Sequence, residues 1–176
     1  NVVTQIAEED LDKVETIICN TDVKALKRNK SHKKIELGKK LTRGMGAGAR
    51  PEVGEGAAEE SLTELSEAVE GANMIFIAAG MGGGTGTGAA PTIARLAKEK
   101  QILTVGIVTI PFSFEGTKRR DSGLAGVERL REFTDTLLVI PNDKLLDAST
   151  QNTSFLEAFH MVDMVLINAI RGITLL

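Results

Sequence analysis

The sequence predicts an α/β domain: a doubly wound, mainly parallel sheet with helices on both faces. Three observations lead to this prediction. Runs rich in Val and Ile recur along the 176 residues, helical patterns separate them, and a polar or glycine-rich segment follows each run. Alternating strands and helices imply right-handed crossovers between parallel strands. In such sheets, ligands bind at the carboxyl ends of the strands.

Four runs are the expected strands, because they are apolar on both faces, as strands between two layers of helices are. The first run ends in Cys19, the single cysteine of the chain. We expect this residue to be a buried strand thiol rather than a nucleophile. In chain order the runs are VETIIC (14–19), NMIFIAA (73–79), ILTVGIVTI (102–110) and TLLVI (136–140).

The helical patterns between these runs carry recognisable start signals. Residues 51–69 open with Pro51 at a first-turn position and Glu52 near the positive end of the helix dipole. The pattern over residues 90–100 places Pro91 in a first turn as well. Both helices are therefore expected to begin at or next to a proline.

Two further helices are expected towards the end of the chain. Residues 119–133 carry mixed charge, whereas residues 154–170 are mostly apolar. Ser154 is a candidate N-cap and Glu157 follows three residues later, which is the pattern of a capping box. Such an apolar helix is expected to be covered on most sides, by the sheet and by something beyond this chain.

Composition and charge restrict the class of protein. With 42% hydrophobic and 26% charged residues, the chain is expected to be one globular domain. A net charge of −3 argues against a dedicated nucleic-acid binder. One cysteine excludes a disulfide framework and fits a reducing cytosol. No run of about 18 apolar residues occurs, and the first residues do not resemble a signal peptide.

The segments that follow the expected strands predict one site built from several loops. They are NTD (20–22), the glycine run (80–88), PFSFEG (111–116) and PND (141–143). In a parallel sheet these four segments meet at one edge. A fifth segment, RGMGAGARPE (43–52), is also rich in glycine and precedes a helix.

The glycine run has six glycines in nine positions, and its hydroxyls are Thr85 and Thr87. Unpaired amides and the helix dipole make a helix N-terminus a site for anions, and glycines let those amides close around phosphate oxygens. A threonine hydroxyl adds a donor or reaches a metal. A strand, this run and a helix therefore predict a phosphate-binding loop rather than a flexible linker.

The run does not by itself identify the nucleotide. The P-loop signature ends in Gly-Lys followed by Ser or Thr, and the run contains no lysine. A dinucleotide fingerprint occurs at Gly84, Gly86 and Ala89, but the same pattern occurs again in the fifth segment. A Rossmann-type NAD(P)-binding oxidoreductase is therefore an alternative, although the loops show no evident catalytic His, Lys or Tyr.

GGGTGTG (82–88), followed by AAP, resembles the signature of the tubulin and FtsZ family, and its bacterial FtsZ form most closely. The likeness extends over nearly the whole chain in the family's order and spacing. The other matching segments are CNTDVKAL (19–26), GMGAGARPEVGEGAAEES (44–61), VTIPFSFEGTKRR (108–120), VIPNDKLL (139–146) and AFHMVDMV (158–165).

The resemblance implies a Rossmann-like, GTP-binding and filament-forming GTPase of bacterial cell division, or an organelle relative, which acts in the cytoplasm at the division site. It implies GTP or GDP with Mg²⁺, held mainly by phosphate oxygens and water. It also implies head-to-tail self-association and other division proteins as partners, no nucleic acid, and membrane contact only through other proteins.

Residues 1–176 resemble the GTP-binding domain of this family, without its first strand and glycine-rich loop and without its C-terminal domain. In the family, the acidic loop of an adjoining subunit completes the active site. We therefore expect no catalytic residue in this chain and an inactive chain on its own. A non-hydrolysing, nucleotide-gated assembly module is a further alternative.

The resemblance also assigns roles to residues. Residues 83–88 would wrap the phosphates, and the loop of residues 46–49 would close over the γ-phosphate. Glu115 and Arg119 match the family's ribose and phosphate contacts. The complete expected nucleotide site is Asn1, Asn20, Thr21, Asp22, Gly46, Ala47, Gly48, Ala49, Gly82, Gly83, Gly84, Thr85, Gly86, Thr87, Gly88, Pro111, Glu115, Arg119, Phe159 and Asp163, with no protein ligand to a metal.

Two members of this set would recognise the base. Phe159 and Asp163 stand four residues apart and so share one helical face. Phe159 is similar to the family residue that stacks on guanine. Asp163 matches the position whose carboxylate accepts from N1–H and the amino group of guanine, a pairing that adenine cannot make.

Nine basic residues lie between positions 24 and 43, and no aromatic residue interleaves with them. This cluster therefore provides no aromatic ring on which nucleic-acid bases could stack. We expect a solvated face, or one side of a filament contact with the acidic residues 8–12. His32 and His160 are isolated from each other, which argues against a transition-metal site. The basic residues are Lys24, Lys27, Arg28, Lys30, Lys33, Lys34, Lys39, Lys40 and Arg43.

Overall fold

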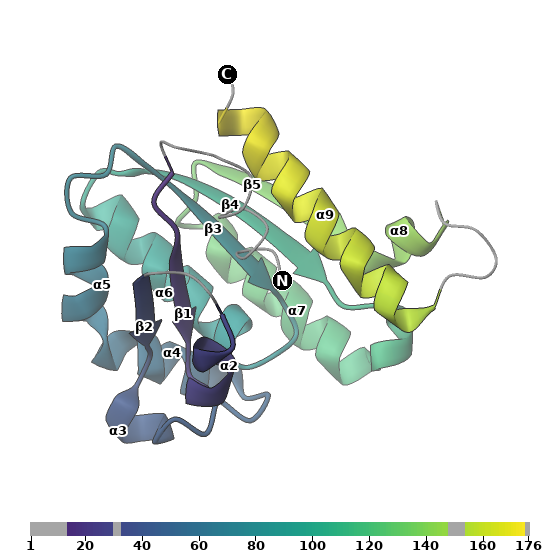
Figure 1. Ribbon diagram of the computed structural model, residues 1–176, viewed down its shortest axis with the longest axis horizontal. Coiled ribbons are helices and arrows are strands. Elements are labelled where there is room, and N and C mark those ends of the chain that lie inside the picture. Colours follow the sequence, from purple (N-terminus) through teal and green to yellow (C-terminus); the bar gives the residue numbers. More distant parts are fainter. Residues whose placement is uncertain (1–13, 30–32, 148–153, 175–176) are drawn as a thin grey trace.

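A computed structural model describes residues 14–29, 33–147 and 154–174 as parallel strands covered by helices (Figure 1). The strands are β1 (Ile17–Asn20), β2 (Lys33–Glu36), β3 (Met74–Gly80), β4 (Leu103–Ile110) and β5 (Thr136–Pro141). The helices are α2 (Val23–Lys27), α3 (Lys39–Thr42), α4 (Pro51–Glu60), α5 (Leu62–Ala68), α6 (Thr85–Glu99), the 3₁₀ turn η1 (Ser113–Glu115), α7 (Thr117–Arg131), α8 (Asn142–Asp147) and α9 (Phe155–Thr174).

Every strand pairing among the described residues is parallel, as the sequence predicts. The pairings form two groups: β1 pairs with β2, and β4 lies between β3 and β5. In the register of these ladders, Cys19 lies opposite Ile35 and Ile77 lies opposite Gly106. Parallel ladders place the carboxyl ends of neighbouring strands at one edge, and that edge carries the candidate site.

The four predicted strands are confirmed as β1, β3, β4 and β5, with ends that differ by a few residues. The strand β2 is not among the predictions. Its sequence, KKIE, is mostly charged and belongs to the basic cluster, so it lacks the apolar pattern of the others. Burial of Ile35 and pairing with β1 make it a strand, and both are tertiary effects.

Of the two helix starts that were predicted at prolines, one is confirmed and one is wrong. Pro51 stands in the first turn of α4, with Glu52 beside it, although the predicted single helix is two helices that meet at Ser61. Pro91, in contrast, lies inside α6, which begins at Thr85. The glycine-rich segment before Pro91 is therefore helical, because close packing against its neighbours fixes a backbone that glycine alone leaves free.

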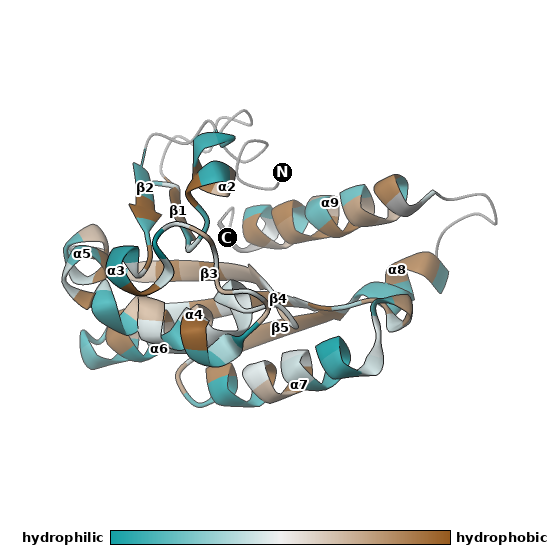
Figure 2. Ribbon diagram, turned by 90° about the horizontal axis from the view of Figure 1, so that it is seen from below, coloured by the Kyte–Doolittle hydropathy of each residue, from teal (hydrophilic) through white to brown (hydrophobic). Residues whose placement is uncertain are grey.

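Two layers of helices enclose the strands β3, β4 and β5. Figure 2 shows α9 on one side of them and α6 and α7 on the other. Side chains alternate along β4: Val105 and Ile107 belong to the core cluster with α9, whereas Val108 and Ile110 face α6 and α7. This alternation confirms the prediction that strands are covered on both faces.

The start of α9 confirms the predicted capping box. The amide of Ser154 donates to the Glu157 carboxylate at 2.7 Å, and the amide of Glu157 donates to the Ser154 hydroxyl at 3.3 Å. The hydroxyl of Ser154 also donates to the Glu157 carboxylate at 2.7 Å, and the two hydrogen bonds that the carboxylate accepts lower the pKa of Glu157. Among the residues that the structure describes, no helix has the length and apolar character needed to cross a membrane.

Candidate functional site

The loops that follow the strands are joined to one another at the carboxyl edge. The hydroxyls of Thr21 and Thr85 lie 2.7 Å apart, which links the end of β1 to the start of α6. The amide of Gly46 donates to the carbonyl of Thr21 at 3.0 Å. On the other side of the glycine run, the amide of Ser113 donates to the Asp143 carboxylate at 2.9 Å. The predicted meeting of these segments is thus confirmed.

Most glycines of the run make room for the protein's own backbone. A Cβ atom on Gly82 would lie 2.6 Å from the carbonyl oxygen of Arg119, and one on Gly84 would lie 2.9 Å from the amide nitrogen of Arg50. A Cβ on Gly86 would overlap the carbonyl oxygen of Gly80 at the end of β3, and one on Gly88 would overlap that of Pro51 in α4. Close packing of the chain on itself, rather than a ligand alone, therefore accounts for these four glycines.

Gly83 differs from its neighbours. A Cβ at this position would meet no atom within 4 Å, so this residue faces open space. The two threonines also differ: Thr87 is buried, and its hydroxyl accepts from the amide of Gly82 at 2.8 Å, whereas Thr85 is half-buried. Gly83 and Thr85 are thus the members of the run best placed to meet a ligand.

The loop of residues 43–50 packs against the start of α6. Its backbone is tightly turned, with a φ of 86° at Gly46 and 57° at Ala49, which is a left-handed conformation for a residue with a side chain. Ala47 is buried and would be 2.6 Å from a Cβ on Gly84. Gly48 and Ala49 are exposed. The loop therefore lies beside the glycine run, as expected.

Asn20 and Asp22 shape the backbone at the end of β1. The Asn20 side chain accepts from the amide of Asp22 at 3.1 Å. The Asp22 carboxylate accepts from the amides of Lys24 at 2.8 Å and Ala25 at 3.2 Å, which makes it the N-cap of α2. These contacts explain both residues as local supports of the loop.

A cleft of about 390 Å³ opens between the glycine run, η1 and α9. It contains six of the predicted site residues and several that were not predicted. The predicted ones are Gly83, Pro111, Glu115, Arg119, Phe159 and Asp163. The others are Ala78, Ala79, Gly80, Met81, Thr109, Asn142, Val162 and Leu166.

The two charged side chains at the η1 end of the cleft are paired with each other. Arg119 lies 3.1 Å from one carboxylate oxygen of Glu115, and the other oxygen accepts from the amide of Phe112 at 3.0 Å. The Glu115 side chain is 12% exposed and that of Arg119 is 52% exposed. Glu115 is thus held in place, whereas Arg119 can move towards a ligand.

Aromatic contacts orient Phe159 at the other end of the cleft. Its ring meets the ring of the buried Phe112 edge-on, with centroids 5.2 Å apart, and Phe112 stacks on Phe114 at 4.9 Å. Phe159 remains 45% exposed. The ring of Phe159 is therefore held by a perpendicular contact with Phe112 but is still partly exposed, so it can stack on a planar ligand.

Asn142 is one of two polar side chains of the cleft that the predicted site omits, and Thr109 is the other. The Asn142 side chain is buried, and its Oδ1 atom has no hydrogen-bond partner within the described part of the chain. A buried acceptor without a donor costs free energy, so this oxygen is expected to accept from water or from a ligand in the cleft. Its place directly after β5, within the segment PND, is a signal in the sequence that could have identified it.

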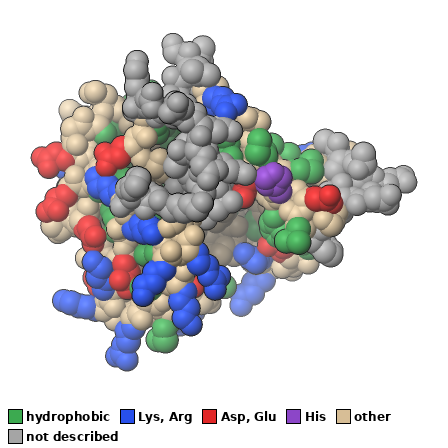
Figure 3. Space-filling model, in the orientation of Figure 1, with side chains coloured by type: hydrophobic (Ala, Val, Ile, Leu, Met, Phe, Trp, Pro, Cys, Tyr) green, Lys and Arg blue, Asp and Glu red, His purple; other side chains and the backbone are tan. Residues whose placement is uncertain are grey.

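The basic cluster lies over α2, β2 and α3, where Figure 3 shows Lys and Arg side chains gathered on the surface. Lys33 is 2.9 Å from Glu15, and Lys39 is 3.3 Å from Glu64. Asn1, the acidic residues 8–12, Lys30 and His32 lie outside the described residues. The described residues hold no group of three or more His, Cys, Asp or Glu side chains that could bind a metal ion.

Comparisons with known proteins agree with this geometry. A family model described as "Tubulin/FtsZ family, GTPase domain" matches residues 2–150. An empty FtsZ dimer from M. jannaschii is 46% identical, with a TM-score of 0.95; the match covers 99% of this chain and 50% of that one. CetZ1 from Haloferax volcanii, a GDP-bound monomer, is 25% identical with a TM-score of 0.82, over 95% and 54% of the chains. This chain spans about half the length of these structures.

Proposed function

This chain belongs to the tubulin/FtsZ family of GTPase domains, and from that premise we propose that it is the nucleotide-binding part of a filament-forming GTPase of cell division. The observation that carries the proposal is the cleft at the carboxyl edge of the strands. It unites an aromatic face, two carboxylates, a guanidinium and an open glycine around one space. GTP or GDP is the ligand that these groups fit.

The base occupies the end of the cleft beside α9. Phe159 stacks on guanine, and the Asp163 carboxylate accepts from N1–H and the amino group, as the family resemblance implies. The buried Oδ1 of Asn142 supports a base at this position, because a base that presents N–H groups would give this acceptor a donor. Adenine carries no N1–H, so this arrangement favours guanine.

The phosphates lie at the start of α6. Gly83 faces open space there, and the positive end of a 15-residue helix favours anions. Glu115 binds the ribose, and Arg119 turns from Glu115 towards the phosphates. Mg²⁺ would be held mainly by phosphate oxygens and water, as the family resemblance implies. When bound, it neutralises part of the phosphate charge.

Hydrolysis is completed by an acidic loop from an adjoining subunit in a head-to-tail filament. The cleft itself has two carboxylates, Glu115 and Asp163, and the proposal assigns both to substrate binding. The M. jannaschii relative is described as a dimer, which supports self-association of this chain's family. We place the protein in the cytoplasm at the division site, where other proteins connect it to the membrane.

The proposal is tested by identifying the nucleotide that co-purifies with the chain. Heat-released ligand should run as GTP or GDP on anion-exchange chromatography, and added GTP should bind to the emptied protein. NAD(P) in the released fraction would refute the proposal and support the oxidoreductase alternative. A protein that binds GTP and assembles without ever releasing phosphate would support the alternative of a nucleotide-gated module.

Asp163→Asn is the matched variant for base recognition. It preserves the size of the side chain and removes the charge. The amide still accepts one hydrogen bond but loses the charge-assisted pair, so GTP binding should weaken by about 1.5–3 kcal/mol. Discrimination against inosine nucleotides, which lack the amino group, should shrink, as competition binding would measure. Unchanged affinity and unchanged base preference would exclude Asp163 from the site.

A further inference from the structure

The helix α4 lies against the start of α6 with almost no side chain between the two backbones. A Cβ atom on Gly54 would overlap the carbonyl oxygen of Gly84, and one on Gly88 would overlap that of Pro51. The α4 side chains that belong to the buried core cluster are Ala57 and Ala58, both in its second half. Small residues therefore allow the first half of α4 to approach α6 closely, but this half contributes no side chain to that core cluster.

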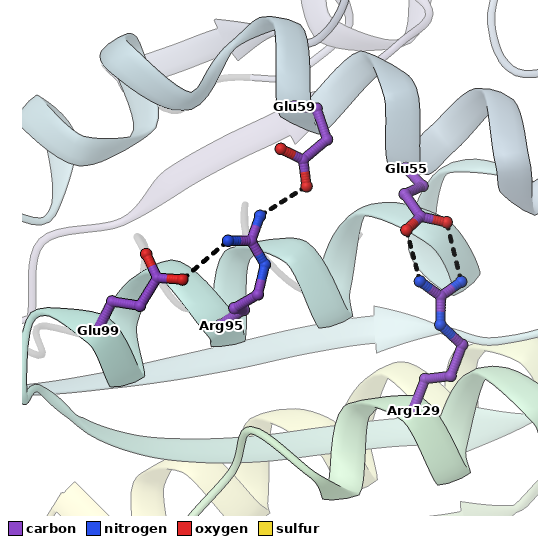
Figure 4. Close-up of polar contacts among 5 residues, drawn as sticks. All are labelled: Glu55, Glu59, Arg95, Glu99 and Arg129. Carbon is purple, nitrogen blue, oxygen red and sulfur yellow. Dashed lines mark hydrogen bonds and ion pairs between the residues drawn. The ribbon is translucent and has the colours of Figure 1, made fainter.

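Ion pairs on the outer surface connect α4 to two other helices (Figure 4). The carboxylate of Glu55 accepts two hydrogen bonds from the guanidinium of Arg129 in α7, at 2.6 and 2.9 Å. Glu59 accepts from Arg95 in α6 at 2.6 Å, and Arg95 also donates to Glu99 at 2.8 Å. The Glu55 pair is bidentate, the geometry that fixes direction as well as distance.

Arg129 belongs to α7, a helix with one face buried in the core. Its neighbours Val127 and Leu130 are buried in the core cluster between the sheet and the helices α6 and α7. The Arg129 guanidinium holds the pKa of Glu55 below its usual value, with the hydrogen bond as the main cause. The pair thus connects the first half of α4 to α7, whose inner face is buried in the core.

The position of α4 sets the position of the loop before it. The loop of residues 43–50 runs directly into Pro51, the first residue of α4. Within that loop, the buried Ala47 and the backbone of Arg50 lie against Gly84, at the start of α6. A small shift of α4 would therefore open or close this loop over the terminal phosphate.

We propose that Glu55 and Arg129 are positioning residues: their ion pair holds the start of α4 at the glycine run, so that the loop of residues 43–50 can distinguish a nucleoside triphosphate from a diphosphate. This inference rests on the proposed function, because it assigns a regulatory contact to the same cleft. The Arg129 and Glu55 side chains are 46% and 38% exposed, so the expected effect is modest.

The test compares dissociation constants for GTP and GDP, measured by calorimetry with Mg²⁺ present. Glu55→Gln and Arg129→Lys should each weaken GTP binding about threefold to tenfold relative to GDP binding. Lysine keeps the charge but cannot form the bidentate pair. The exchanged pair Glu55→Arg with Arg129→Glu should recover part of the loss. Glu99→Gln, which removes a contact within α6, is the control and should leave both constants unchanged.

A second measurement does not depend on nucleotide. Amide hydrogen exchange over residues 43–56 should become faster in Glu55→Gln, while exchange in β4 stays as in the unmodified chain. Equal effects on GTP and GDP, or unchanged exchange in this segment, would overturn the inference. If the unmodified chain binds no guanine nucleotide, the proposed function fails instead, whatever the exchange experiment reports about α4.

Discussion

At the scale of single residues, burial of the Cys19 thiol accounts for its expected low reactivity. It is half-buried in β1 against the core cluster of β2, α4 and α5. Burial, and to a smaller extent the nearby Glu64 carboxylate, raises the pKa of the Cys19 thiol to about 11. Since the thiolate is the reactive form, the folded chain should react slowly with thiol reagents.

We predict that maleimide labels Cys19 of the folded chain at pH 8 about a hundredfold more slowly than it labels the unfolded chain, because the pKa rises from 9.0 to about 11. Denaturant should restore the fast rate. The raised pKa also makes the free energy of unfolding fall between pH 9 and about 11, and Cys19→Ala should remove that part of the pH dependence. Rapid labelling of the folded chain would contradict this account.

The sequence predicts individual site residues where local spacing carries their role. Phe159 and Asp163 share a helical face because of their separation, and both line the cleft. Asn142 shows the limit of this reasoning. The position of the segment PND at the end of β5 places Asn142 at the edge of the sheet. The sequence does not show that its Oδ1 is a buried acceptor, because burial of this atom depends on segments far away in the chain. The same holds for Glu55 and Arg129, which are 74 residues apart.

At the scale of the elements, the contact between α4 and α6 depends on the absence of side chains. Gly54 meets the Gly84 carbonyl so closely that the backbone would have to move to accept a methyl group. We predict that Gly54→Ala lowers the free energy of unfolding by about 2–4 kcal/mol, which denaturant titration would measure. This substitution should disturb the fold even without nucleotide.

Gly83→Ala is the matched control for that variant. No atom lies within 4 Å of a Cβ at this position, so stability should change by less than about 0.5 kcal/mol. If Gly83 faces the phosphates, however, its variant should bind GTP more weakly while folding normally. The opposite pattern, with a stable Gly54→Ala and an unfolded Gly83→Ala, would contradict the packing described for the glycine run.

The sequence predicts the longer helices and most strands, but it predicts the start of α6 less well. The sequence places Pro91 at a helix start because proline favours first turns. In the structure α6 begins six residues earlier, at Thr85, since the glycines there are fixed by contacts with α4 and with the end of β3. Glycine has no strong local preference, so only tertiary contacts decide whether such a segment is loop or helix.

At the scale of the whole molecule, the alternation of apolar runs and helical patterns was sufficient to predict parallel strands between two layers of helices. That architecture places the loops at one edge without further information, which is why the site could be located from sequence. It does not determine which groups inside the cleft are already paired. The contact between Glu115 and Arg119 is such a case, because it depends on the turn η1.

The proposed division of GTP hydrolysis between two subunits gives a prediction at the scale of the whole molecule. The chain alone, at concentrations where it does not self-associate, should release phosphate from GTP at close to the uncatalysed rate even when it binds the nucleotide. The reason is that the proposal assigns Glu115 to the ribose and Asp163 to the base, and these are the two carboxylates of the cleft. Neither carboxylate then orients the attacking water, and phosphoryl transfer depends mainly on such positioning.

The measurement is phosphate release by this chain, by an intact FtsZ-type subunit whose own nucleotide pocket is disabled, and by a mixture of the two. Only the mixture should turn GTP over, because the intact subunit supplies the acidic loop through a head-to-tail, heterologous interface. A single preorganised group of this kind changes the rate by about 10²–10³ in other enzymes, so the difference should be large. Sustained release by the dilute chain alone would show that the catalytic groups lie within these 176 residues, and the proposed division of labour would be wrong.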